Sequence, residues 1–350
     1  MGFVTFLIVL SILVFIHELG HFTVARLLGV KVYVFSIGFG KKLISKQWKG
    51  TQWTFSLIPL GGYVKMKGQE DLNPALANND ADSYNTKTPF QRILILLAGP
   101  AANFILAFLV YIAIGLLGNN YLAPTIGKVV EDSPAFKAGI LKDDEIIKIN
   151  NYDIKTWDDL SHIIKNSDGA LKFYVKRANK IQAITILPKL SDSQNMFREK
   201  IRKKMIGIAP APKIITIYYS PLESISFAYD KTIESSKMIF LGIQKMIQGI
   251  VPTSEIGGVI SIGSVIADAS QSSFVALLTI MALISVNLGV LNLLPIPALD
   301  GGHIVFNIYE MITKRKPKEK VLVYLTMAGW VILLSLMGLG MYNDIVRLLG

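Results

Sequence analysis

The chain contains no cysteine and only four histidines among its 350 residues. The lack of cysteine excludes disulfide bonds and thiolate metal ligands, so any zinc site has to be built from histidine and carboxylate side chains. Charged residues are also scarce: they make up 17% of the chain, against about 25% in soluble globular proteins, while 51% of the residues are hydrophobic. The net charge of +11 is spread along the chain instead of forming one basic tract, which argues against nucleic-acid binding and suits a membrane surface.

Four apolar runs are long enough to cross a bilayer, each being close to the ~20 residues that a spanning helix requires. They extend over residues 3–28, 90–117, 274–294 and 321–341. Lysine and arginine are concentrated after the first run and between the last two, so the positive-inside rule predicts that both loops are cytoplasmic. Both termini and a long insert, residues 119–273, are then expected on the opposite side. No cleavable leader is expected, because the first run carries the motif described next.

The first run contains the motif His17-Glu18-Leu19-Gly20-His21. On a helix, HExxH places two imidazoles four residues apart on one face, where both can bind a single Zn²⁺ ion. Glu18 between them is in position to act as the general base that activates water. The alternative is a chance match with two buried, hydrogen-bonded histidines. Because ionisable side chains inside a span are costly, we favour the functional interpretation.

Asp300 follows the third apolar run, in a segment where two prolines end the helix and two glycines allow close backbone approach. Catalytic zinc commonly has three protein ligands and one open position, so Asp300 is the expected third ligand beside His17 and His21. The depths agree: His17 lies roughly 21 Å along its run at 1.5 Å per residue, and the third run has the same direction. His303 is a competing ligand, which we expect to support the loop instead.

Residues 30–66 are predicted to form strands, since they contain two runs rich in β-branched and aromatic residues with glycines between them. Beside a membrane active site, such a hairpin sheet could dip into the bilayer if protein covers its polar edges, and an open edge could pair with an unwound substrate. A plain amphipathic surface hairpin is the alternative. The polar stretch that follows, residues 69–88, is predicted to be a loop.

The insert begins with a segment, residues 119–190, that resembles a PDZ domain. Its features are a strand, a short helix after Ser133-Pro134, a strand ending near Asn150, a second helix over 156–165 and two closing strands. PDZ domains bind peptides by strand addition, although a spacer role stays open. Residues 191–273 are predicted to be a basic connector followed by amphipathic helices, one of them over 221–250, lying along the outer membrane surface.

The motifs together resemble the site-2 protease family of intramembrane zinc metalloproteases, and within it the bacterial regulator-of-sigma-E branch. The resemblance rests on HELGH in the first run, AGPAANF in the second and NLLPIPALDGGH after the third, with the PDZ-like insert between them. One departure is that about 70 residues suffice for a single PDZ domain, whereas that branch includes tandem ones. The expected fold is a mainly α membrane protein: four transmembrane helices, a membrane-associated β-hairpin sheet and one inserted α+β PDZ domain, in the segments 1–118, 119–190, 191–273 and 274–350.

The resemblance implies that His17, His21 and Asp300 hold Zn²⁺ and that Glu18 activates the attacking water. It implies cleavage of peptide bonds within the transmembrane segments of single-span proteins, such as anti-sigma factors after a first cleavage, and of remnant signal peptides, in the bacterial inner membrane with the PDZ domain in the periplasm. Substrate helices must unwind before attack, and we expect three residues to help hold the unwound strand: Asn292, Pro295 and Pro297. Asn292 has a helix–helix contact as its alternative role.

Two other functions compete with proteolysis. A membrane-anchored PDZ scaffold would use zinc only structurally, without an open coordination position. A metal transporter would need further polar residues along its spans, and these are scarce in the sequence. We therefore predict a protease.

Overall fold

The structure is a computed structural model that describes residues 2–69 and 80–349. Half of the loop predicted at residues 69–88, namely residues 70–79, lies outside the described residues; its end carries a short 3₁₀ turn, η1 (Tyr84–Thr86). The chain divides into two compact units. One, the helical unit, comprises Met1–Ile114 and Pro221–Gly350, and the other, the β unit, comprises Gly115–Ser220. Each is described by itself.

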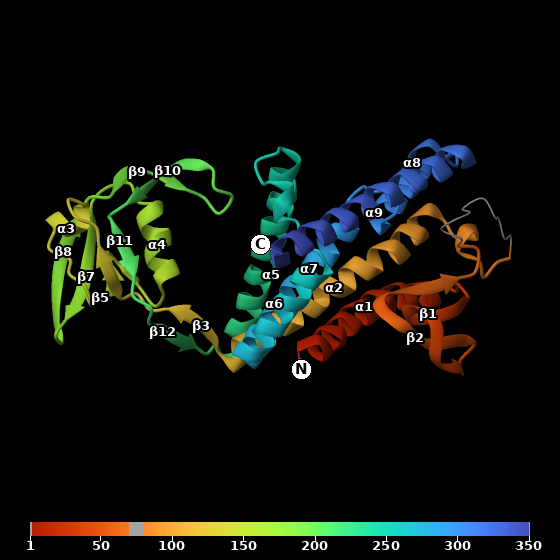
Figure 1. The fold of residues 1–350 in the computed structure, drawn as a ribbon, viewed down its shortest axis with the longest axis horizontal. Coiled ribbons are helices and arrows are strands. Elements are labelled where there is room, and N and C mark those ends of the chain that lie inside the picture. Colours follow the sequence, from red (N-terminus) through yellow and green to blue (C-terminus); the bar gives the residue numbers. More distant parts are fainter. Residues whose placement is uncertain (1, 70–79, 350) are drawn as a thin grey trace. The chain divides into compact units, whose positions relative to one another are not determined.

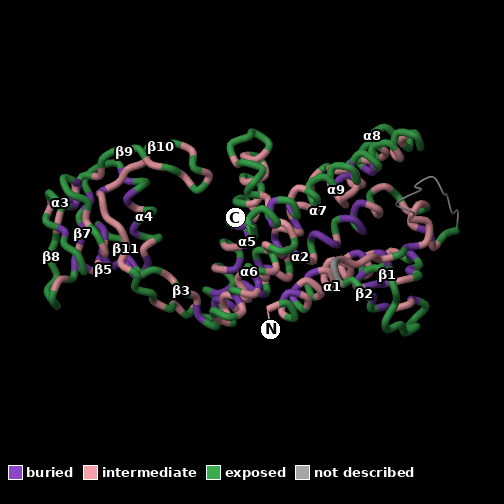
Figure 2. Tube along the Cα trace, viewed as in Figure 1, coloured by how far each residue is buried: buried purple, intermediate pink, exposed green. Residues whose placement is uncertain are grey.

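Four helices of the helical unit are long and apolar enough to cross a membrane, as the sequence predicts. They are α1 (Gly2–Leu27), α2 (Pro89–Leu117), α7 (Phe274–Asn292) and α9 (Glu319–Leu349). Figure 1 shows that α1 and α7 run in one direction and α2 in the opposite one. Large apolar side chains along these helices are exposed, as expected for surfaces that meet lipid (Figure 2). The protein is therefore a multi-pass membrane protein.

Two further helices pack on this bundle: α5 (Pro221–Ile247) and α6 (Val259–Ser272), joined through the 3₁₀ turn η2 (Thr253–Glu255). Ala228 of α5 is buried in a cluster with Ala107 of α2 and Val286 of α7. Ile266 of α6 is buried against Leu13 of α1. The amphipathic pattern thus predicts the helices. In α5, however, the buried face carries small residues, namely Ser224, Ala228, Thr232 and Ser235, whereas large apolar residues such as Ile225 and Ile233 are exposed. The placement of both helices along the outer membrane surface stays a prediction.

A small sheet follows α1, made of β1 (Val32–Trp48) and β2 (Thr51–Met66). Residues 34–37 of β1 pair with residues 62–65 of β2 and also with residues 52–55, so this stretch lies in the middle of the sheet. Phe35 is fully buried there and stacks on Trp53 at a centroid distance of 4.5 Å. The predicted strands are confirmed. They are longer than the apolar runs, because β1 continues past its apolar run into the polar residues near the hairpin tip.

The segment after α7 turns sharply and starts α8 (Asp300–Thr313). Gly301 and Gly302 lie so close to the backbone of residues 293–297 that a Cβ atom at either position would overlap it. The glycines therefore let this turn fold against the beginning of α8, as the close approach predicted from the sequence requires.

The β unit contains a four-stranded sheet in the order β6-β5-β7-β8 and three two-stranded pairs, β4–β11, β3–β12 and β9–β10. Its elements are β3 (Asn119–Leu122), β4 (Ile126–Val129), α3 (Pro134–Lys137), β5 (Glu145–Ile149), β6 (Tyr152–Asp153), α4 (Trp157–Lys165), β7 (Leu171–Arg177), β8 (Lys180–Ile186), β9 (Lys189–Gln194), β10 (Lys200–Met205), β11 (Ile208–Pro210) and β12 (Ile214–Ile217). A hydrophobic core that includes Ile126, Leu160 and Phe173 joins the sheet to α4. A capping box of Thr156 and Asp159 starts α4: the side chain of each residue accepts a hydrogen bond from the main-chain N–H of the other.

The compact β unit extends beyond the segment predicted to be a PDZ domain, residues 119–190. Residues 191–213, predicted as a connector, contain part of β9 and all of β10 and β11, and β11 and β12 pair back onto β4 and β3. The compact unit is Gly115–Ser220, and the segment predicted to be a PDZ domain lies within it. The β9–β10 ribbon has no buried face, because the residues of both strands are exposed or only partly buried. For that reason its sequence reads as a polar linker.

Candidate metal centre

Three predicted ligands come together at one point of the helical unit. His17 and His21 lie one turn apart on α1, and Asp300 is the first residue of α8. Oδ2 of Asp300 lies 3.4 Å from Nε2 of each histidine, and the two Nε2 atoms are 3.2 Å apart. One ligand atom from each residue falls within a span of 4.8 Å. The structure thus unites side chains nearly 280 residues apart in sequence.

These three residues fit a zinc ion. Two imidazole nitrogens and one carboxylate oxygen are a donor set that zinc accepts in catalytic sites, where the fourth position is left for water or substrate. Oδ2 of Asp300 is buried and, within the described part of the chain, has no hydrogen-bond partner. A buried carboxylate oxygen without a partner is costly unless a cation compensates it.

Helix α2 packs directly behind the two histidines. Nδ1 of His21 lies 2.8 Å from the carbonyl oxygen of Ile95, and Nδ1 of His17 lies 3.1 Å from Nδ2 of Asn103. Each imidazole is therefore held at its far nitrogen, which leaves Nε2 facing Asp300. Asn103 thus faces a neighbouring helix, where it contacts a metal-ligand candidate.

Gly99 makes this packing possible. A Cβ atom there would overlap the ring of His21 and lie 2.8 Å from Cε1 of His17. Likewise, a Cβ atom at Gly20 would overlap the backbone of Ala98. Gly99 in α2 and Gly20 in α1 thus allow the two helices to pack closely. The sequence does not show that Gly99 lies against the two imidazoles.

Replacing Gly99 with alanine is expected to weaken zinc binding by about 10-fold or more, because the new methyl group would displace both imidazoles from their common position. The measurement is a zinc titration of the purified protein against a competing chelator. Gly338→Ala in α9 is the matched control, since no atom of the described residues outside the adjoining turns of α9 lies within 4 Å of the added Cβ there. Equal zinc affinity in both variants would contradict this account.

Glu18 lies beside the small sheet. A Cβ atom at Gly62 of β2 would be 3.1 Å from Cγ of Glu18 and 2.7 Å from the carbonyl oxygen of Ser36. The glycine thus lets the strand pass close to the glutamate. This contact joins the sheet to the centre. Apart from the pair Gly61-Gly62, no feature of the sequence indicates it.

The remaining predicted residues surround the turn before α8. Asn292 is the last residue of α7, and Pro297 contacts α8 at Gly302 and α9 at Gly329, while Pro295 lies between. His303, the competing ligand, lies on α8 with its ring 6.0 Å from that of Phe306, and it is not among the metal-ligand cluster of the described residues. The substrate-binding roles of Asn292, Pro295 and Pro297 remain predictions.

Comparisons with known proteins agree with this centre. The model of peptidase family M50 matches residues 5–336. A protein of Campylobacter jejuni, named as a predicted zinc metalloprotease, is 47% identical over 348 residues, which cover 99% of this chain and 94% of the relative. A predicted zinc metalloprotease of Helicobacter pylori is 40% identical, with 99% and 100% covered. The metalloprotease MmpA of Caulobacter vibrioides is 32% identical, with 98% and 95% covered.

Proposed function

Because this chain belongs to peptidase family M50, the site-2 protease family, and is a zinc metalloprotease, we propose that it hydrolyses peptide bonds within the transmembrane segments of single-span membrane proteins. The observation that carries the proposal is the meeting of three ligand candidates beside helices that are long enough to span a bilayer. His17 and His21 lie within one such helix, α1, and Asp300 follows the turn after another, α7. In a soluble protease, the metal ligands would not be expected on helices apolar enough to span a bilayer.

The residues of the centre have two separate roles in this reaction, zinc binding and proton transfer. His17, His21 and Asp300 hold the zinc ion, which when bound supplies a Lewis acid that polarises the scissile carbonyl and makes water acidic enough to be deprotonated near neutral pH. The carboxylate of Glu18 takes the proton from the attacking water and then passes it to the leaving amine. The half-buried position of Glu18 beside Gly62 keeps it close to the ligands and to the sheet edge.

Substrate presentation is the second part of the proposal. A transmembrane helix hides its carbonyl groups in hydrogen bonds, so it has to unwind before water can attack. Residues 62–65 of β2 pair with β1 on one side and pass beside Glu18, so their outer edge suits the addition of an extended substrate strand. Asn292, Pro295 and Pro297, in the bend between α7 and α8, are our candidates for contacts on the other side.

The experiment that tests this function uses the purified full chain in detergent or lipid vesicles with a panel of single-span substrates, among them anti-sigma-factor segments and remnant signal peptides. We expect cleavage inside the apolar segment, its loss on adding a zinc chelator and its return on adding zinc. A membrane-anchored scaffold with a structural zinc site is the alternative, and it predicts no cleavage of any member of the panel.

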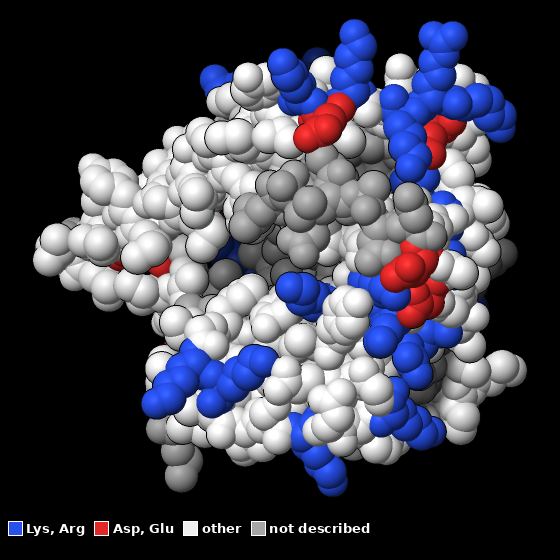
Figure 3. All heavy atoms as spheres, turned by 90° about the vertical axis from the view of Figure 1, so that its right-hand side faces the viewer, with Lys and Arg blue, Asp and Glu red and all other residues white. Residues whose placement is uncertain are grey.

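For localisation we propose a bacterial inner membrane. The face drawn in Figure 3, which lies at the end of the helical unit where α8 and the β1–β2 sheet are found, carries many more lysine and arginine side chains than acidic ones. Its basic segments are residues 31–49 and 314–320. By the positive-inside rule this face is cytoplasmic, and the insert between α2 and α7 is then periplasmic.

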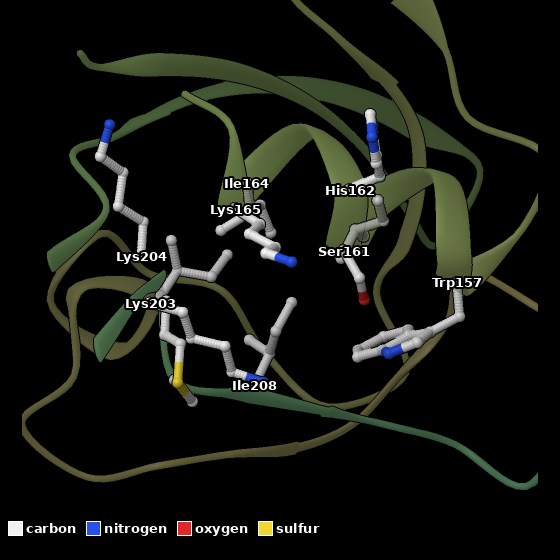
Figure 4. Close-up of a pocket in the computed structure, with 12 residues that line it drawn as sticks. Trp157, Ser161, His162, Ile164, Lys165, Lys203, Lys204 and Ile208 are labelled. Carbon is white, nitrogen blue, oxygen red and sulfur yellow. The ribbon is translucent and has the colours of Figure 1, made fainter. Parts of the chain in front are cut away.

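For the β unit we propose a PDZ-like role in binding an extended peptide. A groove lies between α4 and the β10–β11 segment, and its lining includes the buried apolar residues Leu160, Ile164 and Ile206. Three lysines, Lys165, Lys203 and Lys204, also line it (Figure 4). A lining of apolar and polar side chains suits strand addition of a peptide. Fluorescence titration with labelled peptides of the substrate's periplasmic part tests this; no saturable binding would leave the unit as a spacer.

A further inference from the structure

The two histidines of the metal centre are held at Nδ1 by chemically different partners. For His21 the partner is the main-chain carbonyl of Ile95, at 2.8 Å. For His17 it is the side-chain amide of Asn103, with Nδ2 at 3.1 Å. A carbonyl oxygen can only accept a hydrogen bond, whereas an amide side chain can donate through nitrogen or accept through oxygen.

The carbonyl partner fixes the tautomer of His21. Because it only accepts, Nδ1 of neutral His21 has to carry the proton, and Nε2 keeps its lone pair. Nε2 is the atom that faces Asp300. His21 is therefore ready to bind a metal ion before the ion arrives.

His17 is in the opposite state. With Nδ2 of Asn103 donating to it, Nδ1 of neutral His17 is the acceptor, so the proton resides on Nε2, which faces Oδ2 of Asp300 at 3.4 Å. A zinc ion on Nε2 needs the lone pair there and moves the proton to Nδ1, which then has to donate. The amide as it stands offers no acceptor to that proton.

Asn103 is able to meet both states. Its Oδ1 is buried and has no hydrogen-bond partner among the described residues, and half a turn about the Cβ–Cγ bond exchanges the oxygen and the nitrogen with little change in shape. The rest of the residue is fixed, since its side chain is fully buried and its main-chain oxygen accepts from Oγ of Ser285 on α7 at 2.8 Å. Only the amide needs to turn.

We propose that Asn103 is a positioning residue whose amide rotates when zinc binds, so that Oδ1 accepts from Nδ1–H of His17 and selects the tautomer that binds the metal. No charge is gained or lost in this change, since the proton moves from Nε2 to Nδ1 of the same neutral ring. The proposal depends on the zinc centre but not on the nature of the substrate.

The test measures zinc affinity, independently of proteolysis, with purified protein and a competing chelator. Two variants of nearly equal size separate the roles: Asn103→Asp keeps an acceptor and removes the donor, and Asn103→Leu removes both. We expect Asn103→Leu to bind zinc ~10–100-fold more weakly and Asn103→Asp to bind about as tightly as the unchanged chain. Ser285→Ala, which loses only the contact to the main-chain oxygen, is the control and should keep the native affinity.

Native zinc affinity in Asn103→Leu, or an equal loss in Asn103→Asp and Asn103→Leu, would overturn the proposal. The thermal unfolding temperature of the zinc-free variants shows whether each is folded. Should Asn103→Leu fail to fold, histidine-selective ¹⁵N NMR of the unchanged chain decides the matter. We expect His17 to be protonated at Nε2 without zinc and at Nδ1 with it, and the same tautomer in both forms would refute the rotation. Failure of proteolysis alone would leave these readouts unaffected.

Discussion

Replacing Glu18 with glutamine is expected to reduce peptide-bond cleavage by about 10²–10⁴-fold while zinc binding stays close to native, because the amide cannot take a proton from water. The variant keeps the size of the side chain beside Gly62 and removes none of the three metal-ligand candidates. The measurement pairs initial cleavage rates of a single-span substrate with the zinc content of the same preparation.

The pairing of these two readouts separates the competing functions. A scaffold with a structural zinc site would show no effect of Glu18→Gln on any readout, and a protease would lose rate alone. Undiminished cleavage by the variant would exclude Glu18 as the general base. Loss of zinc together with rate would show that Glu18 supports the centre itself.

Replacing Asp300 with alanine is expected to weaken zinc binding by more than the ~10–100-fold that removal of a ligand's hydrogen-bond partner costs, because a ligand itself is lost. Only two imidazoles on α1 would remain, and catalytic zinc sites commonly have three protein ligands. The measurement is zinc affinity by chelator competition, followed by cleavage in the presence of excess zinc.

His303→Ala is the matched control for this variant. His303 lies three residues further along α8 and is a possible ligand by residue type, but among the described residues it stands outside the cluster of ligand atoms. It should therefore bind zinc like the unchanged chain. Loss of zinc in His303→Ala with retention in Asp300→Ala would reverse the assignment.

The metal centre could be predicted from sequence because its signals are local. HExxH fixes two imidazoles on one helical face, and the direction of the apolar runs brings Asp300 to the same depth as His17. The four long helices and the strands at residues 30–66 follow from composition and periodicity in the same way, and the structure contains all of them.

What could not be predicted depends on contacts between distant segments. The sequence around Asn103 does not show whether its side chain packs against a helix or binds an imidazole. The contact with His17 depends on how α2 packs on α1. Residues 34–37 pair on two sides, which no strand pattern specifies. The β9–β10 ribbon was missed because its residues do not alternate between a buried and a polar face strongly enough to distinguish a strand from a linker.

The order of the parts along the chain has a consequence for biosynthesis. Both imidazoles and the two groups that hold them, the carbonyl of Ile95 and the amide of Asn103, belong to the first two helices, but the carboxylate belongs to residue 300 of 350. A nascent chain therefore contains two of the three ligand candidates, but not the third, during most of its translation. The three ligands can meet only after the third long helix has been made and the turn that follows it has folded back, so the centre is completed late in synthesis.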